Sequence, residues 1–250
     1  MLRNNTQILN LLALEYNCSP NDFYKSNNII TSVSCNEGQR IYAQKQTFFK
    51  MITFGSNVVI SADTALHPFL EQYTDGKTGH YLFEIPNLLP IEKELNYHGY
   101  TLTQSFHMFL PAVKCEPKKN YQLRWYIDEE IYQFYGDSRF PNAICTEFTE
   151  TRPDKIVVCA YDNDNIMGMA GCSEDAKGLF QIGIDVMPEY RSMGVGTYLV
   201  TVLKNRIIEA GAIPFYGTSV SNYHSWNIAI NSGFRPAWIE IAAQRIKQND

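Results

Sequence analysis

One stretch decides the fold: Gln181-Ile-Gly-Ile-Asp-Val-Met-Pro-Glu-Tyr-Arg-Ser-Met-Gly-Val-Gly-Thr-Tyr-Leu-Val200. Residues 179–187 alternate and are rich in β-branched side chains, which predicts a strand. Proline cannot donate to a sheet ladder, so we expect this strand to end at Pro188. From Val195 onward the apolar residues recur at the spacing of one helical face, which predicts a helix that stops before Gly211.

A glycine loop joins the predicted strand to the predicted helix. Gly194 and Gly196 have no side chain, and they lie where the first N–H groups of the helix have no internal partner. These donors point outward and the helix dipole is positive there, so we expect the loop to bind a phosphate or a pyrophosphate. A dinucleotide fingerprint would need a glycine at Leu199, and the Gly-Lys-Ser/Thr of a Walker A loop does not occur in the sequence.

The pattern Arg-x-x-Gly-x-Gly after a Val-x-Pro strand end resembles the signature of the GNAT superfamily of acyl-CoA-dependent N-acetyltransferases. The matching residues are Val186, Pro188, Arg191, Gly194 and Gly196. An ordinary turn between strand and helix, with glycines that serve packing, is the alternative interpretation.

The resemblance continues downstream in the expected order. A strand over residues 213–220 is followed by Asn222-x-x-Ser225, a short helix and Gly233-Phe234, which is similar to the second conserved block of the family. The matches extend over roughly residues 120–240.

The resemblance implies acetyl-CoA as co-substrate, with its pyrophosphate on the glycine loop and its pantetheine chain beside the 179–187 strand. A strand amide near Val186 would then polarise the thioester oxygen. Arg191 could bind a CoA phosphate or cap the turn, and Asn222 is also a good helix N-cap. The expected CoA-binding residues are Val186, Met187, Arg191, Ser192, Met193, Gly194, Val195, Gly196, Thr197, Asn222 and Ser225.

A thioester donor requires an amine in line with its carbonyl carbon, a donor for the oxyanion and a route for the proton. Strand alternation places Gln181, Gly183 and Asp185 on one face, which makes Asp185 the candidate base. Gly183 is expected to leave room for a substrate beside it. The alternative is that Asp185 is a solvated carboxylate at the strand end.

The reaction also needs an acid that protonates the leaving thiolate. The family is thought to use a tyrosine on the last helix of the motif, but the matching position here is Ala229. Tyr223, His224 or Ser225 could replace it. His224 is the candidate we name, and the alternative interpretation is that it is an ordinary polar residue of the helix. A thiol with a pKa of about 8–9 could also leave unassisted.

Length and composition indicate a globular protein of two domains. The 21 basic and 26 acidic residues give a net charge of −5 without a basic stripe, which argues against nucleic acid as a partner. The apolar run Ile8–Leu14 is too short to span a membrane, so no membrane association is expected. The six cysteines show no metal or disulfide spacing and are expected to be reduced and mostly buried, which favours the cytoplasm. The histidines likewise show no metal spacing, so no metal is expected.

The sequence divides near residue 115, where a polar linker over Pro111–Asn120 separates two halves. Residues 1–115 predict an N-terminal α/β domain. Its expected elements are a helix near 5–16, strands near 40–44, 57–62, 79–85 and 105–110, and a helix near 90–98. Gly99-Tyr100 after that helix parallels Gly233-Phe234, so this domain is either a degenerate GNAT-like half without the glycine loop or an unrelated α+β cap.

Residues 116–250 are expected to form the GNAT domain. Strands are predicted at 121–127, 155–161 and 166–173, the last two joined by a hairpin, and Asp128 is expected to cap a helix that reaches Tyr135. With the strands and helices described above, this order implies an α+β fold built on a mixed, twisted sheet.

The predicted function is transfer of an acetyl group from acetyl-CoA to an amine, on a small molecule or on a peptide or protein. A catalytically silent CoA-binding or interaction protein is the alternative, because Ala229 replaces the expected tyrosine. A homodimer is compatible with the sequence, which carries no code for the acceptor.

Overall fold

The structure, a computed structural model, describes residues 2–45, 48–112 and 115–247. The chain forms two compact units, Met1–His107 with Ala237–Asp250, and Met108–Pro236. The expected division at residue 115 thus lies after the observed one, and the last strand returns the chain to the first unit. Part of the expected linker, residues 113 and 114, lies outside the described residues.

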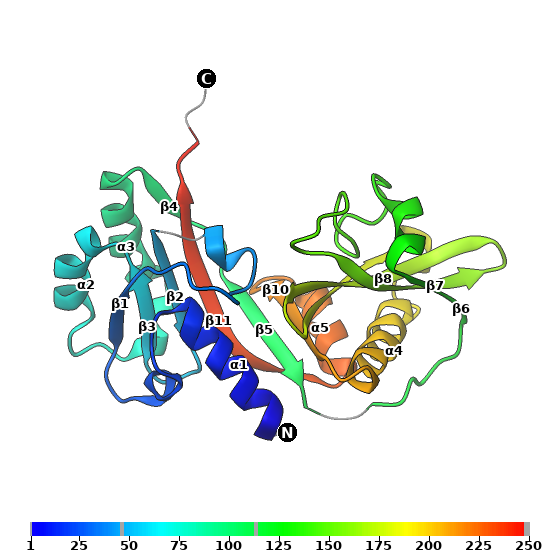
Figure 1. Ribbon diagram of the computed structural model, residues 1–250, viewed down its shortest axis with the longest axis horizontal. Coiled ribbons are helices and arrows are strands. Elements are labelled where there is room, and N and C mark those ends of the chain that lie inside the picture. The colour runs from blue at the N-terminus through cyan, green and yellow to red at the C-terminus, as the bar shows by residue number, and fades with distance from the viewer. Residues whose placement is uncertain (1, 46–47, 113–114, 248–250) are drawn as a thin grey trace. The chain divides into compact units, whose positions relative to one another are not determined.

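The second unit is built on a mixed sheet (Figure 1). Neighbouring strands are antiparallel from the first to the fourth, and the fourth and fifth are parallel. The predicted strands of this half are confirmed, with ends shifted by up to three residues. In sheet order they are β6 (Gln122–Ile127), β7 (Asp154–Asp162), β8 (Asn165–Ala176), β9 (Leu179–Val186) and β10 (Ile213–Ser219).

Helices α4 (Val195–Glu209) and α5 (Tyr223–Asn231) cover one face of this sheet (Figure 1). The apolar positions that predicted α4 are buried against the strands, among them Leu199, Leu203 and Ile207. Burial of this face, rather than helix propensity, supplies most of the stability of such a helix.

The opposite face of the sheet is covered by the segment between β6 and β7 (Figure 1). The predicted α-helix capped by Asp128 is wrong: residues Asp128–Phe134 form the 3₁₀-helix η5, and Asp128 has a φ of +49°. A capping residue needs an extended backbone, and here Ile127 takes that position and donates its N–H to the Glu130 carboxylate at 3.0 Å.

A loop after η5 lies directly on two strand glycines. A Cβ atom on Gly171 would collide with the backbone oxygen of Ala143, and one on Gly183 would collide with that of Asn142. Both glycines are therefore required by close approach of backbone to sheet.

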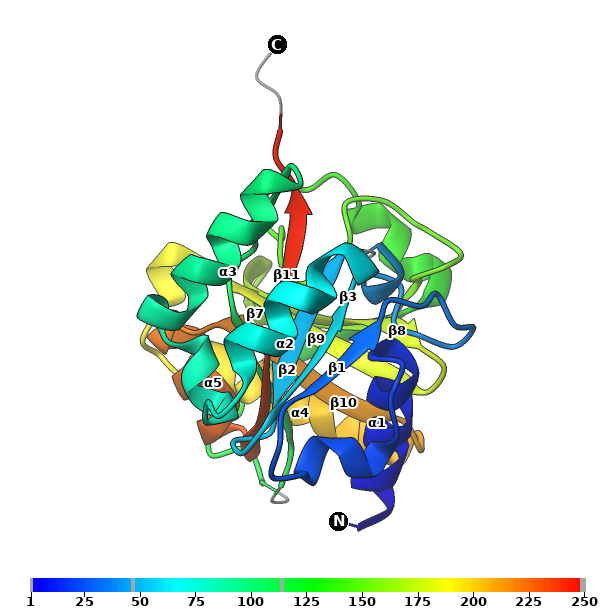
Figure 2. The ribbon, with the colours of Figure 1, turned by 90° about the vertical axis from the view of Figure 1, so that its left-hand side faces the viewer.

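The strands of the first unit are covered on one face by α2 and α3 (Figure 2). In it, β1 is parallel to β3, while β2 is antiparallel to both β3 and β11, and β4 is antiparallel to β11. The elements are α1 (Leu2–Glu15), β1 (Ile29–Ser32), β2 (Phe49–Thr53), β3 (Val58–Ala62), α2 (His67–Thr74), α3 (Ile85–Tyr97), β4 (Tyr100–Leu102) and β11 (Phe234–Arg245). Strand β5 (Phe106–Pro111) spans the boundary between the two units along the chain.

Two strands predicted in the first half are wrong. Residues 40–44 lead into the 3₁₀-helix η2 (Ala43–Lys45), and residues 79–85 include the 3₁₀-helix η4 (Gly79–Phe83). In η4, Gly79 lies so close to the backbone of Asn57 that a Cβ atom would collide with it, a tertiary contact that local propensity does not contain. Strands β1, β2 and β4 and helix α2 were not predicted.

The expected similarity between the two halves is observed at two glycines. Gly99 follows α3 with a φ of +79°, and Gly233 follows α5 with a φ of +82°, each just before a strand. Both glycines allow the left-handed turn that ends a helix. That the first unit is a degenerate GNAT-like half stays a prediction.

Other expectations from composition are partly corrected. Only Cys159 and Cys172 are buried, whereas Cys35 is exposed and the other three cysteines are half-buried. Within the described part of the chain, no helix is long and apolar enough to cross a membrane. The same residues contain no group of three His, Cys, Asp or Glu side chains that could bind a metal ion.

A buried ion network ties α1 to β11 within the first unit. The Arg40 guanidinium, 1% exposed, binds Glu15 at 2.7 Å and Glu240 at 2.9 Å, and the Trp238 indole donates to Glu240 at 2.7 Å. Removing one partner from such a network leaves an uncompensated buried charge, which is costly.

We therefore expect Arg40→Met to lower the free energy of unfolding by about 3–5 kcal/mol. Lys25→Met, which removes the exposed ion pair with Asp22, is the control, and its effect is expected to stay below about 1 kcal/mol. Urea titrations measure both values, and equal effects of the two substitutions would contradict this account of the network.

Candidate functional site

The glycine loop between β9 and α4 is open to solvent. Arg191, Ser192, Met193 and Gly194 are exposed, and burial begins at Val195. Gly194 is the N-cap of α4 with a φ of +85°, a left-handed conformation that glycine adopts at little cost. The loop is thus accessible to a ligand.

The amides at this helix start lack helical partners, as predicted. The first helical hydrogen bond runs from the Tyr198 N–H to the Gly194 carbonyl at 3.0 Å. The N–H groups of Val195, Gly196 and Thr197 precede it, so they are the donors that an anion could accept from.

Gly196 is required for a different reason from Gly194. A Cβ atom there would lie 2.9 Å from the Cδ1 atom of Ile228 and 3.3 Å from the Cγ2 atom of Val186. The absence of a side chain lets the start of α4 pack closely against both α5 and β9. The two glycines of the motif therefore have separate roles, one conformational and one in packing.

Two side chains from the segment before β6 fix the loop carbonyl of Met193. The Lys119 ammonium and the Tyr121 hydroxyl both donate to this oxygen, the hydroxyl at 2.7 Å. A trans peptide group is planar, so its C=O and N–H point in opposite directions. Fixing the Met193 oxygen therefore directs the Gly194 N–H away from Lys119 and Tyr121, and it polarises that N–H as a donor.

Strands β9 and β10 separate halfway along their length. Their parallel register runs from Ile213 beside Leu179 to Tyr216 beside Ile182, whereas β9 continues to Val186. This leaves the edge of residues 183–186 without a partner strand in that register.

The direction of the β9 amides can be read from one hydrogen bond. The Met187 N–H donates to Met167 of β8 at 3.0 Å. Because successive amides of a strand alternate in direction, those of Ile184 and Val186 point away from β8, toward the separated edge. The Arg191 Nε atom donates to the Val186 carbonyl at 3.4 Å from that same side.

The residues predicted on α5 are placed at its start. The Asn222 side chain accepts the Ser225 N–H at 3.2 Å and so caps the helix, as its alternative interpretation held. His224 is exposed in the first turn. Ala229 is fully buried in the core, so the family position for an acid has no polar group here.

Sequence reasoning missed Tyr216, the last residue of β10 that pairs with β9. Its side chain is only 2% exposed. Burial raises the pKa of the Tyr216 phenol, the Ser225 side chain partly offsets this, and the Asp185 charge adds a smaller increase, so the phenol stays protonated at neutral pH. Its place at the end of the β9–β10 pairing was visible only once the register was known.

Asp185, the candidate base, has both carboxylate oxygens engaged. It accepts the backbone N–H groups of Asn142 and Ala143, each at 2.8 Å, and the Asn142 side-chain amide at 2.6 Å. The room expected beside Gly183 is filled by Asn142. These contacts favour a positioning role for Asp185, and its role as a base stays a prediction.

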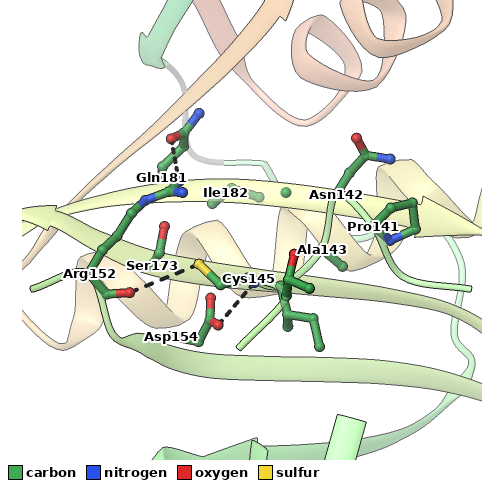
Figure 3. A pocket seen from close by; sticks show the side chains of 12 residues that line it. Pro141, Asn142, Ala143, Cys145, Arg152, Asp154, Ser173, Gln181 and Ile182 are labelled. Atoms are coloured by element: carbon green, nitrogen blue, oxygen red, sulfur yellow. Dashed lines mark hydrogen bonds between the residues drawn. The ribbon is translucent and has the colours of Figure 1, made fainter. Parts of the chain in front are cut away.

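A polar cavity of about 280 Å³ lies on the sheet face opposite α4 (Figure 3). Its floor comes from β7, β8 and β9, and its wall from the loop over Gly183. Burial raises the pKa of the Cys145 thiol to about 11, so this cysteine is not a nucleophile at neutral pH. The lining side chains with polar groups are Asn142, Cys145, Thr146, Arg152, Asp154, Ser173 and Gln181.

Residues 119–234 match the model of a family described as the acetyltransferase (GNAT) family. No curated protein matches the chain. The fold of this segment, a mixed sheet with helices, is the GNAT fold.

Several solved structures are similar to the chain. A GNAT-family acetyltransferase from Colwellia psychrerythraea is 11% identical over 83% of this chain and 84% of its own, with a TM-score of 0.46. A GCN5-related N-acetyltransferase-like protein from Streptococcus suis is 12% identical over 75% and 78%, with a TM-score of 0.46. A Salmonella typhimurium protein solved with its cofactor acetyl-CoA is 15% identical over 38% and 66%, with a TM-score of 0.31. At these values the family assignment rests on the match of residues 119–234.

Asp185→Ala tests the positioning role. The N–H groups of Asn142 and Ala143 lose their acceptor, so we expect the free energy of unfolding to fall by about 1–3 kcal/mol and the loop to be cleaved faster by protease. Asp164→Ala, in the exposed turn between β7 and β8, is the matched control. Equal stability of the two variants would show that these hydrogen bonds do not hold the loop.

Proposed function

We propose that this chain, whose residues 119–234 form a GNAT acetyltransferase domain, binds acetyl-CoA and transfers its acetyl group to an amine. The observation that carries the proposal is the exposed loop with a left-handed Gly194, placed beside the separated edge of β9. The loop suits a diphosphate, and the separated edge suits an extended chain that ends in a thioester.

In this proposal the diphosphate of CoA accepts the N–H groups of residues 194–197. Arg191 lies at the end of the separated edge, where its guanidinium can pair with a phosphate while Nε stays on Val186. The pantetheine chain would then extend along residues 183–186, as an added strand does at a free sheet edge. The amides of Ile184 and Val186 are the donors available to the thioester oxygen.

The reaction follows from this placement. The amine nitrogen attacks the thioester carbon, the N–C bond forms, the C–S bond breaks, and CoA leaves as a thiolate. The nitrogen loses its proton to water, since the carboxylate of Asp185 is occupied by three N–H donors. Tyr216 of β10 and Ser225 of α5 are the candidates to protonate the thiolate in place of the missing tyrosine.

A catalytically silent CoA-binding protein is the second candidate. It is favoured by the apolar, buried Ala229 and by the engagement of Asp185 within the protein. Release of CoA thiol from acetyl-CoA, measured across amines and peptides, separates the two: the enzyme releases thiol only when an accepted amine is present.

The acceptor is a small-molecule or peptide amine in this proposal. The six free cysteines among the described residues support placement in the reducing cytoplasm.

Gly194→Val tests the loop. Valine strongly disfavours a φ of +85°, so we expect the dissociation constant for CoA, measured by calorimetry, to rise at least about tenfold. Gly211→Val is the matched control, because Gly211 lies just beyond the other end of α4 with a φ of +81° and has open space around its Cα. Equal losses in both variants would point to general damage to α4, and unchanged binding in Gly194→Val would remove the loop from the CoA site.

Tyr121→Phe tests the alignment of the Met193–Gly194 peptide. It removes one hydrogen bond to the Met193 oxygen, so we expect CoA affinity to fall by about three- to tenfold, equivalent to about 0.7–1.4 kcal/mol. Tyr132→Phe, an exposed tyrosine on η5, is the control. A Tyr121→Phe protein that binds CoA as tightly as this control would show that the hydroxyl does not prepare the loop.

A further inference from the structure

Helix α5 lies beside the separated edge of β9 at the glycine loop. A Cβ atom on Gly196 would lie 3.3 Å from Val186 of β9 and 2.9 Å from Ile228 of α5, so the two elements come together there. At the other end of the edge, Tyr216 is the last residue of β10 that pairs with β9. Residues 183–186 therefore lead from the loop back toward Tyr216.

Three aromatic side chains, Phe109, Tyr216 and Trp226, form a cluster where β9 and β10 separate. The Phe109 ring of β5 packs edge-to-face on the Trp226 ring of α5, with 4.9 Å between centroids, and on the Tyr216 ring, with 6.4 Å. Phe109 is 0% and Tyr216 2% exposed, and Trp226 is half-buried. All three belong to the second unit. Rings packed in this way cannot make room for a ligand without losing these contacts.

Side-chain alternation places this aromatic cluster directly beyond Ile184. Ile182 and Ile184 point to the same face of β9, and Tyr216 lies beside Ile182 in the parallel register. Ile184 and Trp226 both pack against the buried core that includes Phe109 and Tyr216. A group that extends past Ile184, away from the glycine loop, thus meets the aromatic cluster.

The room between Ile184 and the aromatic cluster is short. Two residues separate Ile184 from Ile182, or about 6.6 Å along a strand, and Ile182 is already paired with Tyr216. In the proposed function the diphosphate binds at the loop, so the acyl end of the chain points away from the loop and toward the cluster. An acetyl group suits this length, whereas a long acyl chain would have to displace packed rings.

We infer that the aromatic cluster limits the length of the acyl group, and that Trp226 is the specificity-determining residue contributed by α5. The inference rests on the proposed function and deepens it, because it names the side chains that exclude longer acyl donors. The exclusion comes from ring packing, so it depends on the volume of these side chains and on no charge.

Trp226→Ala tests the inference by removing one ring from the aromatic cluster. Calorimetry with acetyl-CoA and hexanoyl-CoA measures binding without an acceptor amine. In the unmodified protein we expect the dissociation constant of hexanoyl-CoA to be at least about tenfold that of acetyl-CoA. In Trp226→Ala we expect this ratio to fall by about tenfold, because the space left by the indole admits the chain.

Two further variants serve as control and as second test. Trp125→Ala removes the same type of side chain from the edge strand β6, where it is 37% exposed, and should keep the ratio of the unmodified protein. Phe109→Leu keeps an apolar residue in the core but removes a second ring of the aromatic cluster, so the ratio should fall as in Trp226→Ala. Circular dichroism checks that each variant is folded.

The inference is overturned if hexanoyl-CoA binds the unmodified protein as tightly as acetyl-CoA does. It is also overturned if Trp226→Ala and Phe109→Leu keep the original ratio, or if Trp125→Ala lowers it equally. Absence of binding of CoA and both acyl-CoA ligands to the unmodified protein would instead refute the proposed function, so the two failures are distinguishable.

Discussion

The peptide group between Met193 and Gly194 is the constraint on which the candidate site depends. Lys119 and Tyr121 donate hydrogen bonds to its oxygen. Its nitrogen belongs to Gly194, which has a left-handed backbone conformation that glycine adopts at little cost. A rigid turn of this kind binds an anion without reorganising, because the N–H donors are already aimed before the ligand arrives. The elements around it, strand β9 and helix α4, then determine where the rest of a bound molecule can go.

Close backbone packing shapes the other side of the sheet. Gly171 and Gly183 let the loop of residues 141–145 lie on the strands, and Asp185 holds that loop by three hydrogen bonds. Gly183 and Asp185, which the strand pattern predicted to lie beside a substrate, instead contact this loop. The polar cavity beside this loop is a consequence of the same packing, since the loop closes it on one side.

The elements near the glycine loop could be predicted from sequence because their signals are local. Strand alternation, a proline stop and helical spacing gave β9 and α4, and Gly194 marked the turn. The engagement of Asp185, the contact of Tyr216 with Ser225 and the fixing of Met193 join residues far apart in the chain, so no local pattern contains them. The same holds for η5 and η4, where tertiary contacts override propensity.

Titration of isotope-labelled protein with CoA, followed by the amide signals of residues 192–197, tests the central claim most directly. We expect saturable shifts that are largest for Gly194 to Thr197, with smaller shifts for Ile184 and Val186 along the separated edge. Tight binding of CoA that leaves these amide signals unchanged, or no binding at all, would contradict it.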